Sequence, residues 1–467
     1  MFSKSLVARC CLFCAAAFLS VAAVAVEPIK IKVPERPAGQ KHVLGLTAPK
    51  LDKVRVGFIG VGMRGPGAVF RMSSIEGVEI KAICDLREKC ARRVLKGLQK
   101  KGYKNHVDIY YGTETAWKKL CERPDIDLVY IATDWKHHAE MGVYAMECGK
   151  HVAIEVPSAM TLDEIWALVN TSERTRKHCM QLENCCYDTF ELNTLNMAQQ
   201  GLFGEVIHCE GAYIHNLSEF WNTYWNNWRW NYNKEFRGDV YATHGLGPVC
   251  QVLNIHRGDK LKTLVSMDTK AFTGMAGTKK QAPGEKPFQN GDHTMTFIST
   301  EKGKTILIEH DVMNPRPYSR MYQVAGLDGF ANKYPMEQYS FRPAKGRKEG
   351  SKAPAVDSLN EHRAISKQAK AKLEEEYRHP FLRKIGKRAK KAGGHGGMDF
   401  VMEYRLVHCL RNGLRLDMDV YDLAEWCSVA ELSRISLENG CAPVEVPDFT
   451  RGHWKDEEGL KFDMTGW

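Results

Sequence analysis

The sequence predicts an α/β protein in two parts, a doubly wound parallel sheet followed by an α+β domain with a mainly antiparallel open sheet. Three observations support this prediction. Short apolar runs alternate with helical stretches from 54 to about 184, which is typical of a parallel sheet with helices on both faces. A glycine-rich turn follows the first run. Beyond 204, longer alternating strands follow one another with few helices between them, which favours an antiparallel sheet.

The predicted elements follow in chain order. In the first part we expect strands at 54–59, 78–84, 128–132, 151–155 and 179–184, and helices at 64–74, 87–100, 137–148 and 161–176. In the second part we expect a helix at 193–201 and strands at 205–213, 262–268, 293–300 and 304–312. Residues 26–50 are rich in Pro and Lys and are predicted to be an arm or linker. The two domains are therefore placed at 51–185 and 186–467.

The glycine turn carries the pattern of a Rossmann dinucleotide-binding domain. Gly60, Gly62 and Gly65 stand at the spacing Gly-x-Gly-x-x-Gly between a strand and a helix. The first glycine makes the tight turn, the second lets the backbone approach a pyrophosphate, and the third allows close packing of helix and strand. Asp85 ends the second strand, where a carboxylate bonds the ribose 2′-OH and favours NAD over NADP. NAD is therefore the predicted cofactor, although Arg64 weakens the predicted preference for NAD over NADP. The alternative is a glycine-rich turn that binds no dinucleotide.

The first 25 residues have the composition of a secretory signal peptide. Lys4 and Arg9 precede an apolar run from Cys10 to Val24, and small residues at 23–25 fit a cleavage site. The alternative is an uncleaved membrane anchor, for which the run is short. We expect an exported protein, periplasmic or secreted, with no membrane span after cleavage near Ala25.

The cysteines do not indicate a metal site. Three of the 15 lie in the predicted signal peptide, and the others are scattered singly except for Cys185 and Cys186. His and Cys do not cluster at the spacings that bind zinc, so we expect no metal and mostly buried thiols. An oxidising compartment permits disulfides, whose pairing stays open.

The net charge of +10 does not indicate a nucleic-acid partner, because one segment carries it. Residues 341–395 contain 16 Lys or Arg and 6 Asp or Glu, a net of +10, so the rest of the chain is balanced. Such runs are usually solvated. We expect a basic, partly helical insert, with acidic glycans or a membrane surface as alternative partners.

Two aromatic segments are candidate binding regions. Trp135, His137 and His138 follow strand 128–132, where a Rossmann loop passes the nicotinamide side of the cofactor; the alternative is that these rings only cap a helix. Residues 220–232 combine aromatic rings with amides and Arg229. Aromatic faces stack on sugars, while Asn and Arg bond hydroxyls and an acetamido oxygen. This composition favours a sugar site over the alternative, an aromatic core.

Two acid–base groups stand three residues apart after Asp239. On a helical turn, Tyr241 and His244 share a face. His transfers protons near neutral pH, and Tyr acts as acid or base when a neighbour lowers its pKa. They are the candidate catalytic residues; the alternative for His244 is a structural histidine buried against the sheet.

The end of strand 151–155 points to a family. From 54 to about 330 the chain resembles the glucose–fructose oxidoreductase and inositol dehydrogenase superfamily, in which Glu-Lys-Pro stands here and the lysine assists hydride transfer to or from a sugar hydroxyl. This chain has Glu155, Val156 and Pro157, and a valine neither donates a proton nor polarises an oxygen. With further motifs at 182–187, 226–230, 241–248 and 395–399, it resembles the NAD-dependent α-N-acetylgalactosaminidases, exported bacterial glycoside hydrolases, over nearly its whole mature length.

The resemblance implies hydrolysis assisted by a transient oxidation. Tightly held NAD⁺ oxidises the 3-hydroxyl of a terminal α-linked N-acetylgalactosamine, which acidifies the hydrogen at C2. A base removes that proton, the glycosidic oxygen leaves, water adds at C1, and the hydride returns to C3. Such enzymes are exceptions to the two-carboxylate route. The expected partners are glycans ending in N-acetylgalactosamine, and a homo-oligomer is compatible with the sequence.

The resemblance also implies individual contacts. The expected cofactor contacts, besides the three glycines, are Met63, Arg64, Asp85, Trp135, Lys136, His137, His138, Glu155, Val156 and Asn184. The expected substrate contacts are Tyr213, Arg229, Tyr241, Ala242, Thr243, His244 and Tyr322. The acid that protonates the leaving oxygen is unassigned.

Two other functions compete with this prediction. One is an exported NAD(P)-dependent sugar oxidoreductase that keeps the hydride, against which Val156 argues. The other is a glycan-binding protein without activity, against which Tyr241 and His244 argue.

Overall fold

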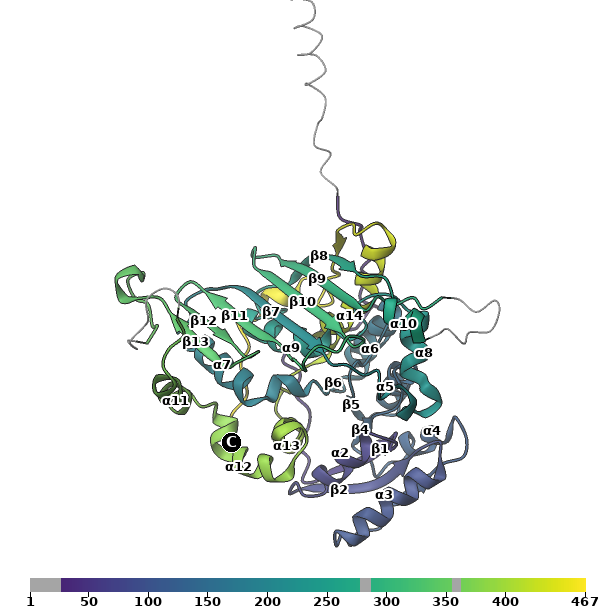
Figure 1. Ribbon diagram of the computed structural model, residues 1–467. Coiled ribbons are helices and arrows are strands. Elements are labelled where there is room, and N and C mark those ends of the chain that lie inside the picture. The colour runs from purple at the N-terminus through teal and green to yellow at the C-terminus, as the bar shows by residue number, and fades with distance from the viewer. Residues whose placement is uncertain (1–26, 278–286, 355–362) are drawn as a thin grey trace, which may run out of the picture.

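The computed structural model describes residues 27–277, 287–354 and 363–467. Two sheets organise the chain: Figure 1 shows the strands of the larger sheet across the upper half of the molecule and the smaller sheet with its helices below. The predicted signal peptide, 1–25, lies outside the described residues. Within the described ranges, no helix combines the length and the apolar character that a membrane crossing requires.

The N-terminal sheet has six parallel strands in the order β3-β2-β1-β4-β5-β6. Its strands are Val54–Ile59 (β1), Val78–Cys84 (β2), Asp108–Tyr110 (β3), Leu128–Ile131 (β4), His151–Ile154 (β5) and Cys179–Gln181 (β6). The central strands β4 and β5 are fully buried because helices cover both faces, which explains their continuous apolar sequence. The strand order reverses between β1 and β4, as in a doubly wound sheet, and confirms the predicted fold class of this part.

Helices pack on both faces of this sheet. They are Gly65–Met72 (α2), Glu88–Lys100 (α3), Ala116–Cys121 (α4), Trp135–Glu147 (α5) and Leu162–Thr175 (α6). In α3 the buried residues follow a helical spacing and form one apolar stripe. In α6 the Thr161 and Glu164 side chains accept each other's backbone N–H groups, a capping box that fixes where the helix begins.

The C-terminal sheet has eight strands in the order β13-β12-β11-β7-β10-β9-β8-β14. They are Val206–Ile214 (β7), Leu261–Asp268 (β8), His293–Thr300 (β9), Thr305–Asp311 (β10), Tyr322–Gly326 (β11), Gly329–Asn332 (β12), Gln338–Phe341 (β13) and Val444–Glu445 (β14). Neighbouring strands are antiparallel except β7 and β10, which are parallel. The predicted mainly antiparallel sheet is therefore confirmed.

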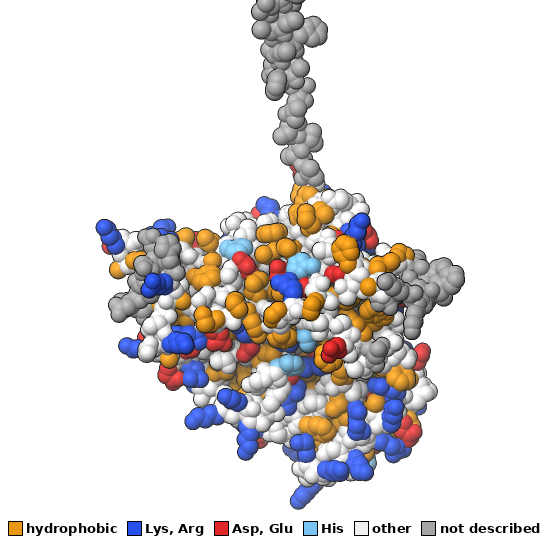
Figure 2. Space-filling model, viewed as in Figure 1, with side chains coloured by type: hydrophobic (Ala, Val, Ile, Leu, Met, Phe, Trp, Pro, Cys, Tyr) orange, Lys and Arg blue, Asp and Glu red, His pale blue; other side chains and the backbone are white. Residues whose placement is uncertain are grey.

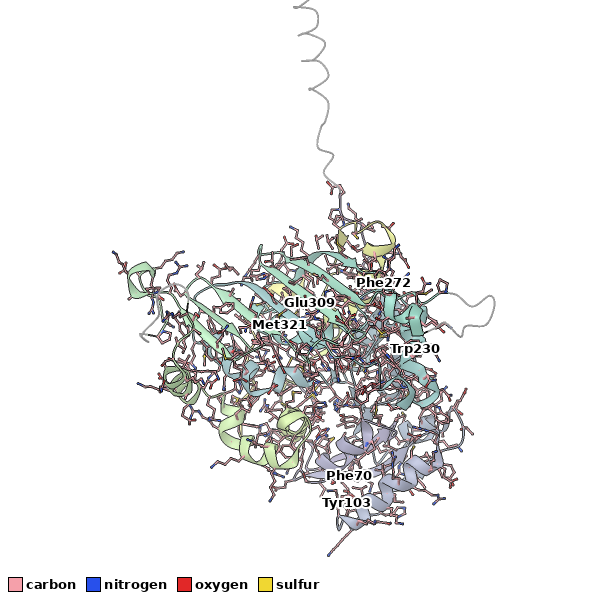
Figure 3. The ribbon with its side chains drawn as sticks, viewed as in Figure 1. Phe70, Tyr103, Trp230, Phe272, Glu309 and Met321 are labelled. Atoms are coloured by element: carbon pink, nitrogen blue, oxygen red, sulfur yellow. The ribbon has the colours of Figure 1, made fainter. Side chains whose placement is uncertain are left out.

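The second part contains eight helices among the described residues, of which the third and the last pack on one face of this sheet. The helices are Thr189–Gln199 (α7), Trp228–Glu235 (α8), Thr243–Leu253 (α9), Phe272–Gly277 (α10), Lys367–Glu376 (α11), Pro380–Ala392 (α12), Met398–Asn412 (α13) and Val420–Glu438 (α14). Helix α9 packs so closely on β7 that a Cβ on Gly245 would lie 2.6 Å from the backbone nitrogen of Ala212. On the other face Met295 is exposed, and Glu309, labelled in Figure 3, pairs with it across β9 and β10.

The segment 27–50 is an arm packed along the surface. Ile29 bridges Val444 at the edge of the second sheet. Arg36 forms an ion pair with Glu173 of α6 at 3.0 Å, and the buried Val43 donates its N–H to the hydroxyl of Tyr421. The arm therefore joins the two parts of the molecule.

The basic segment 341–395 contains α11 and α12, while its residues 355–362 lie outside the described residues. Helix α12 buries Phe381, Leu382 and Ile385 and turns its basic residues outward. The segment therefore contributes to the core as well as to the charged surface.

Candidate functional site

The glycine turn between β1 and α2 is packed against the end of β4. Gly60 has a φ of +86°, and a Cβ on it would lie 2.5 Å from the carbonyl oxygen of Ala132. A Cβ on Gly65 would overlap the carbonyl oxygen of Gly60. Only glycine fits at these two positions. The N-terminus of α2, with its free N–H groups, is thereby held over the carboxyl end of β1, where such groups bind a pyrophosphate.

Asp85 follows β2 on the same edge of the sheet and is held in a fixed orientation. Its Oδ2 accepts the N–H of Val61 at 2.9 Å, and its Oδ1 accepts the N–H of Arg87 at 2.9 Å. The carboxylate therefore lies directly beside the glycine turn, where it can accept a hydrogen bond from a ribose hydroxyl. The Arg87 Nε, 3.3 Å from Oδ1, adds a cation that the sequence reading did not single out.

A cavity of about 960 Å³ opens in front of these strand ends. Its lining includes Gly60, Gly62, Met63, Arg64, Asp85, Thr133 and His137 of the Rossmann part and Tyr224, Trp225 and Trp228 of the second part. The cavity has the size of a cofactor site. Since Gly60 and Gly65 leave no room for a Cβ and the Asp85 carboxylate lies beside the turn, these residues fit a bound NAD.

Several expected cofactor residues do not line this cavity, and two of them, His138 and Lys136, are engaged in other contacts. The ring nitrogens of His138 lie 2.8 Å from the carbonyl oxygen of Pro157 and 3.2 Å from that of Thr133, so His138 ties α5 to the segment after β5. Burial lowers the pKa of His138. The exposed Lys136 faces Glu235. His137 does line the cavity, and its hydrogen bond with Asp134 raises its pKa.

A charged network joins the Rossmann part to α13. Arg64 lies 3.4 Å from Glu155 through Nη2 and 3.5 Å from Asp399 through Nη1. Asn184 donates its Nδ2–H to Oδ1 of Asp399 at 2.6 Å. Two expected cofactor contacts, Arg64 and Asn184, therefore meet at the buried Asp399 from a distant part of the chain, and Glu155 joins them through Arg64.

Tyr241 and His244 lie at the start of α9 with their ring centroids 4.9 Å apart. The Nδ1 of His244 is 2.6 Å from Oε1 of Glu183, just beyond β6. Burial lowers the pKa of His244 to about 4. The ring is therefore neutral at pH 7, with Nδ1–H donating to the carboxylate and Nε2 left as an acceptor. Burial raises the pKa of Tyr241 well above its usual value, so its hydroxyl is a donor.

Other predicted residues join the same cluster of rings. Tyr213 on β7 lies 4.8 Å from Tyr241 and 5.2 Å from His244, centroid to centroid. The Arg229 guanidinium on α8 lies over the Tyr241 ring at 4.7 Å and over the Trp135 ring at 5.0 Å. The cluster thus brings together six predicted residues from separate segments: Trp135, Val156, Tyr213, Arg229, Tyr241 and His244.

The remaining predicted substrate contacts are placed differently. Ala242 and Thr243 are buried beside Tyr241, at the N-terminus of α9. Tyr322 lies in the main hydrophobic core, edge-on to Phe190 of α7 with centroids 6.2 Å apart. Strand β11 turns this ring toward α7, so the structure does not bring Tyr322 to the cluster and its predicted role as a substrate contact is corrected.

Three residues that the sequence reading missed border the cluster. The hydroxyl of Tyr213 bonds Nδ1 of His215 at 2.9 Å, and the Tyr318 ring lies edge-on to His215 at 4.8 Å. Arg320 lies over Tyr213 at 6.0 Å, with its Nη1 3.1 Å from Sγ of Cys185. His215 stands just beyond the predicted strand 205–213, and that position is a signal that could have found it. Tyr318 and Arg320 precede β11, a strand that the sequence analysis did not predict. Figure 2 shows histidine and charged side chains near the middle of this face, between the sheet and the Rossmann part.

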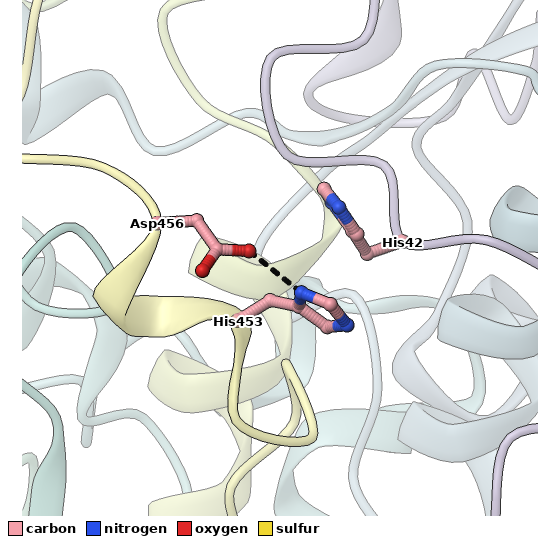
Figure 4. Close-up of side chains that lie close together, drawn as sticks. All are labelled: His42, His453 and Asp456. Carbon is pink, nitrogen blue, oxygen red and sulfur yellow. Dashed lines mark hydrogen bonds and ion pairs between the residues drawn. The ribbon is translucent and has the colours of Figure 1, made fainter.

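Three groups of candidate metal ligands occur among the described residues. Glu183, Cys185 and His244 belong to the site above. His256 and Asp422 are buried and Asp419 is half-buried; Arg257 pairs with Asp422 at 2.7 Å and balances its charge. His42, His453 and Asp456 are shown in Figure 4. The two imidazole rings are stacked, with centroids 4.2 Å apart and planes at 28°, so their nitrogen lone pairs do not point to one common position for a metal. We assign none of the three to a metal.

The comparisons with known proteins divide the chain at the same place as the two sheets. Residues 187–456 match the model of the glycosyl hydrolase 109 C-terminal domain, and residues 54–182 match the NAD-binding Rossmann fold of an oxidoreductase family. Glycosyl hydrolase family 109 protein 1 of Phocaeicola vulgatus is 66% identical over 92% of this chain and 91% of its own length. The chain belongs to glycosyl hydrolase family 109. A second family 109 protein, from Bacteroides thetaiotaomicron, is 62% identical over 98% of both chains.

This family 109 chain shares its fold with solved sugar dehydrogenases. Levoglucosan dehydrogenase in complex with NADH and levoglucosan superposes with a TM-score of 0.62, at 18% identity, over 85% of this chain and 100% of its own. The myo-inositol dehydrogenase of Lactobacillus casei gives 0.55 at 15% identity over 85% and 99%. The family 109 glycoside hydrolase is therefore built on an NAD-binding Rossmann domain with a second, mainly antiparallel domain.

Proposed function

We propose that this family 109 protein is an exo-acting α-N-acetylgalactosaminidase that uses NAD without net redox change. The observation that carries the proposal is that two sites adjoin in a glycoside hydrolase. Arg64 of the glycine turn lies 3.4 Å from Glu155, and the two charges act on both sites: Glu155 on Tyr241, and Arg64 on Tyr241 and His244. An ordinary glycosidase needs two carboxylates at the scissile bond and no dinucleotide.

NAD⁺, when bound, supplies a hydride acceptor for C3 of the sugar and returns the hydride at the end of each cycle. The protein supplies the proton transfers. Once C3 is a ketone, the C2–H proton is acidic, and the neutral His244 with a free Nε2 is placed to take it. The C1–O bond then breaks, the leaving oxygen takes a proton, and water adds at C1. The Tyr241 hydroxyl donates a hydrogen bond within this cluster.

The proposed sugar subsite has a donor suited to an N-acetyl group. Nη1 of Arg229 donates to the hydroxyl of Tyr224 at 3.1 Å. Nε of Arg229 is buried and has no partner among the described residues. A buried donor without a partner is costly, and an acetamido carbonyl would satisfy it. We therefore assign recognition of the N-acetyl oxygen to Arg229, and sugar stacking to the surrounding aromatic rings.

We also propose that the protein is exported and acts on terminal residues of glycans outside the cytoplasm. The composition of residues 1–25 supports export. The basic outer face of α12 would attract acidic glycans at low ionic strength.

The deciding assay uses 4-nitrophenyl α-N-acetylgalactosaminide with purified holoenzyme. We expect release of nitrophenol, no lasting change in absorbance at 340 nm, and exchange of the C2 hydrogen with deuterated solvent. Lasting NADH with unhydrolysed sugar would instead identify an oxidoreductase. Hydrolysis without C2 exchange would exclude elimination. The matched 4-nitrophenyl α-galactoside, which lacks the acetamido group, should be a poorer substrate.

A further inference from the structure

Four arginines are buried among the described residues, and they differ in their counter-charges. Two of them, Arg257 and Arg405, each have an aspartate oxygen 2.7 Å away. For the other two, Arg229 and Arg320, no carboxylate oxygen lies within 4.0 Å in the part of the chain that the structure describes. An unpaired buried charge is costly, so it points to a negative charge that a ligand brings or that a reaction forms.

The backbone holds Arg320 firmly against β7. The carbonyl of Met321, labelled in Figure 3, accepts the N–H of Ala212 at 3.0 Å, and Ser319 exchanges two backbone hydrogen bonds with the end of β7, each at 2.9 Å. This register places Arg320 opposite Tyr213, with its guanidinium carbon 6.0 Å from the centroid of that ring. The charge therefore has a fixed position at the border of the sugar cluster.

Most hydrogen-bond donors of this guanidinium are unused. Nη1 of Arg320 donates to Sγ of Cys185 at 3.1 Å and to Oδ1 of Asn184 at 3.5 Å. Nε is buried and has no partner among the described residues. A thiol is a weak acceptor, and a guanidinium has five N–H donors, so strong donors remain free. An oxygen anion is the acceptor that such donors bind most strongly.

The acidic groups around the guanidinium do not neutralise it. Cys185, Tyr318 and Tyr213 act on it most strongly, followed by Glu183. Burial raises the pKa of Cys185, Tyr318 and Tyr213, so all three are uncharged near pH 7. The Glu183 carboxylate bonds His244 at 2.6 Å instead. The site thus holds a positive charge that its own residues leave uncompensated.

The proposed base lies within reach of this charge. The Tyr213 ring, which the guanidinium covers, is 5.2 Å from the His244 ring, centroid to centroid. Burial first and the charge of Arg320 second lower the pKa of His244 against the opposing effect of Glu183. A negative charge formed by proton transfer to His244 would therefore arise close to Arg320.

Resting on the proposed function, we propose that Arg320 stabilises the enolate oxygen at C3 of the sugar, which becomes negative when the C2 proton leaves. Nε2 of His244 takes the proton, the electron pair of the C2–H bond forms a C2–C3 double bond, and the carbonyl pair moves onto the oxygen at C3. The carbonyl then re-forms, a C1–C2 double bond forms, and the C1–O bond breaks. Its electron pair leaves with the glycosidic oxygen, which takes a proton.

The positions of the two unpaired arginines assign them different parts of the sugar. Arg229 donates to the hydroxyl of Tyr224 and lies over the ring of Tyr241, on the side given to the N-acetyl group. Arg320 contacts Asn184, an expected cofactor residue, so it lies on the side that C3 must face to exchange its hydride. The C3 ketone is uncharged before the C2 proton leaves. Donors fixed where a charge develops favour that step over binding of the resting sugar.

The test compares Arg320→Gln and Arg320→Lys with a matched control, Arg316→Gln. Glutamine removes the charge, whereas lysine keeps it. Arg316 lies on the same segment, but it is 40% exposed and pairs with Glu309 at 3.3 Å, so its variant reports on disturbance of the segment alone. The measurements are melting temperature, affinity for NAD and for free N-acetylgalactosamine by fluorescence titration, exchange of the C2 hydrogen with deuterated solvent, and the 340 nm transient in a single turnover.

We expect Arg320→Gln to slow C2 exchange and nitrophenol release by roughly 10²- to 10³-fold, the usual effect of removing one donor to an oxyanion. The 340 nm signal should rise at the wild-type rate, because hydride transfer comes first, and should decay more slowly. Both affinities should be unchanged, and the melting temperature should not fall, since the lost charge had no partner. Arg320→Lys should lose less activity, and Arg316→Gln should behave as wild type.

The proposal is overturned if Arg320→Gln exchanges C2 hydrogen as fast as Arg316→Gln. It is also overturned if the loss of rate follows a loss of N-acetylgalactosamine affinity, since Arg320 would then bind the resting sugar, or if the rise at 340 nm slows as much as C2 exchange. A wild-type protein that releases no nitrophenol would instead refute the proposed function before any variants are compared.

Discussion

Nδ1 of His244 lies 2.6 Å from Oε1 of Glu183, and this contact is buried on both sides. The same oxygen accepts the N–H of Cys185 at 3.1 Å, so the carboxylate is fixed behind the ring. Glu183 therefore decides which nitrogen of His244 carries the proton, although the sequence analysis assigned it no role within the motif 182–187. The neutral ring presents Nε2 to the cluster of Tyr213 and Tyr241.

We predict that Glu183→Gln lowers nitrophenol release by roughly 10²-fold or more, because the amide no longer fixes the acceptor at Nε2. NAD content should not change. The control is Glu210→Gln on β7. Oε1 of Glu210 lies 3.4 Å from Nε2 of His208, so this variant changes a similar carboxylate–histidine contact outside the site. Equal rates for the two variants would contradict the role of Glu183, and His244→Ala gives the lower limit of activity.

Gly65→Ala should damage both stability and cofactor binding, because its Cβ would overlap the carbonyl oxygen of Gly60. Overpacking of this kind costs about 1–3 kcal/mol in the free energy of unfolding. Gly67→Ala is the matched control: its Cβ would meet only the flexible end of Arg71, 2.9 Å away. Urea unfolding and NAD titration should separate the two variants, and equal behaviour would show that the turn has room to relax.

Asp85→Ala should weaken NAD binding by about 1.5–3 kcal/mol, the contribution of a hydrogen bond to a charged group. It should also reduce the ratio of NAD affinity to NADP affinity. Arg87 would remain beside the site as a partner for a 2′-phosphate. Fluorescence titration of the apoprotein with each dinucleotide measures both effects. Asp108→Ala on the neighbouring strand β3 is the control, and an unchanged NAD to NADP ratio in Asp85→Ala would refute the assignment.

Asp311 should make stability depend on pH in the acid range. Burial alone would raise its pKa, but hydrogen bonds from His293, Asn314 and the backbone N–H of Met313 lower it to about 2. A carboxyl whose folded pKa is depressed adds stability above its unfolded pKa, and this stability is lost as pH falls toward the folded value. Asp311→Asn should therefore cost on the order of 1–2 kcal/mol at pH 6 relative to wild type, and less at pH 3.

Urea unfolding of wild type and Asp311→Asn at pH 6, 4 and 3 measures this difference. The difference in free energy of unfolding between the two proteins should decrease only below the usual pKa of an aspartate. A gap that stays constant over the whole series would mean that the carboxylate is not specifically stabilised in the folded protein. Activity of the variant reports separately on the segment 311–320, which Asp311 anchors and which carries Tyr318 and Arg320.

The parallel sheet was predictable because strands buried on both faces appear as short apolar runs. The bounds predicted for β1 and β2 agree with the structure. Strand β3 was missed because Asp108–Tyr110 is a short, half-buried strand at the sheet edge, with no apolar run. Strands β11 to β13 were missed as well, since they are short and interrupted by turns.

The candidate site was predictable where its chemistry is local in the sequence. The glycines and Asp85 are recognisable by spacing, and Tyr241 and His244 by their separation on one turn. Glu183 and Asp399 lie in the motifs 182–187 and 395–399, but their roles were not predictable, because tertiary packing alone brings them to His244 and Arg64. Tyr322 was misplaced for a related reason: it lies within β11 and faces the core, whereas Tyr318 precedes the strand and reaches His215.

Arg71 of α2 forms its ion pair with Glu403 of α13 at 2.6 Å, and Arg64 reaches Asp399 on the same helix. The Rossmann part thus pairs its two arginines with carboxylates that belong to the second part. If the Rossmann part were joined to another second domain, Arg71 would lose both of its carboxylate partners, Asp399 and Glu403, whereas Arg64 would keep Glu155. The two domains are therefore not exchangeable as independent units, because a new second domain would have to supply carboxylates opposite Arg71.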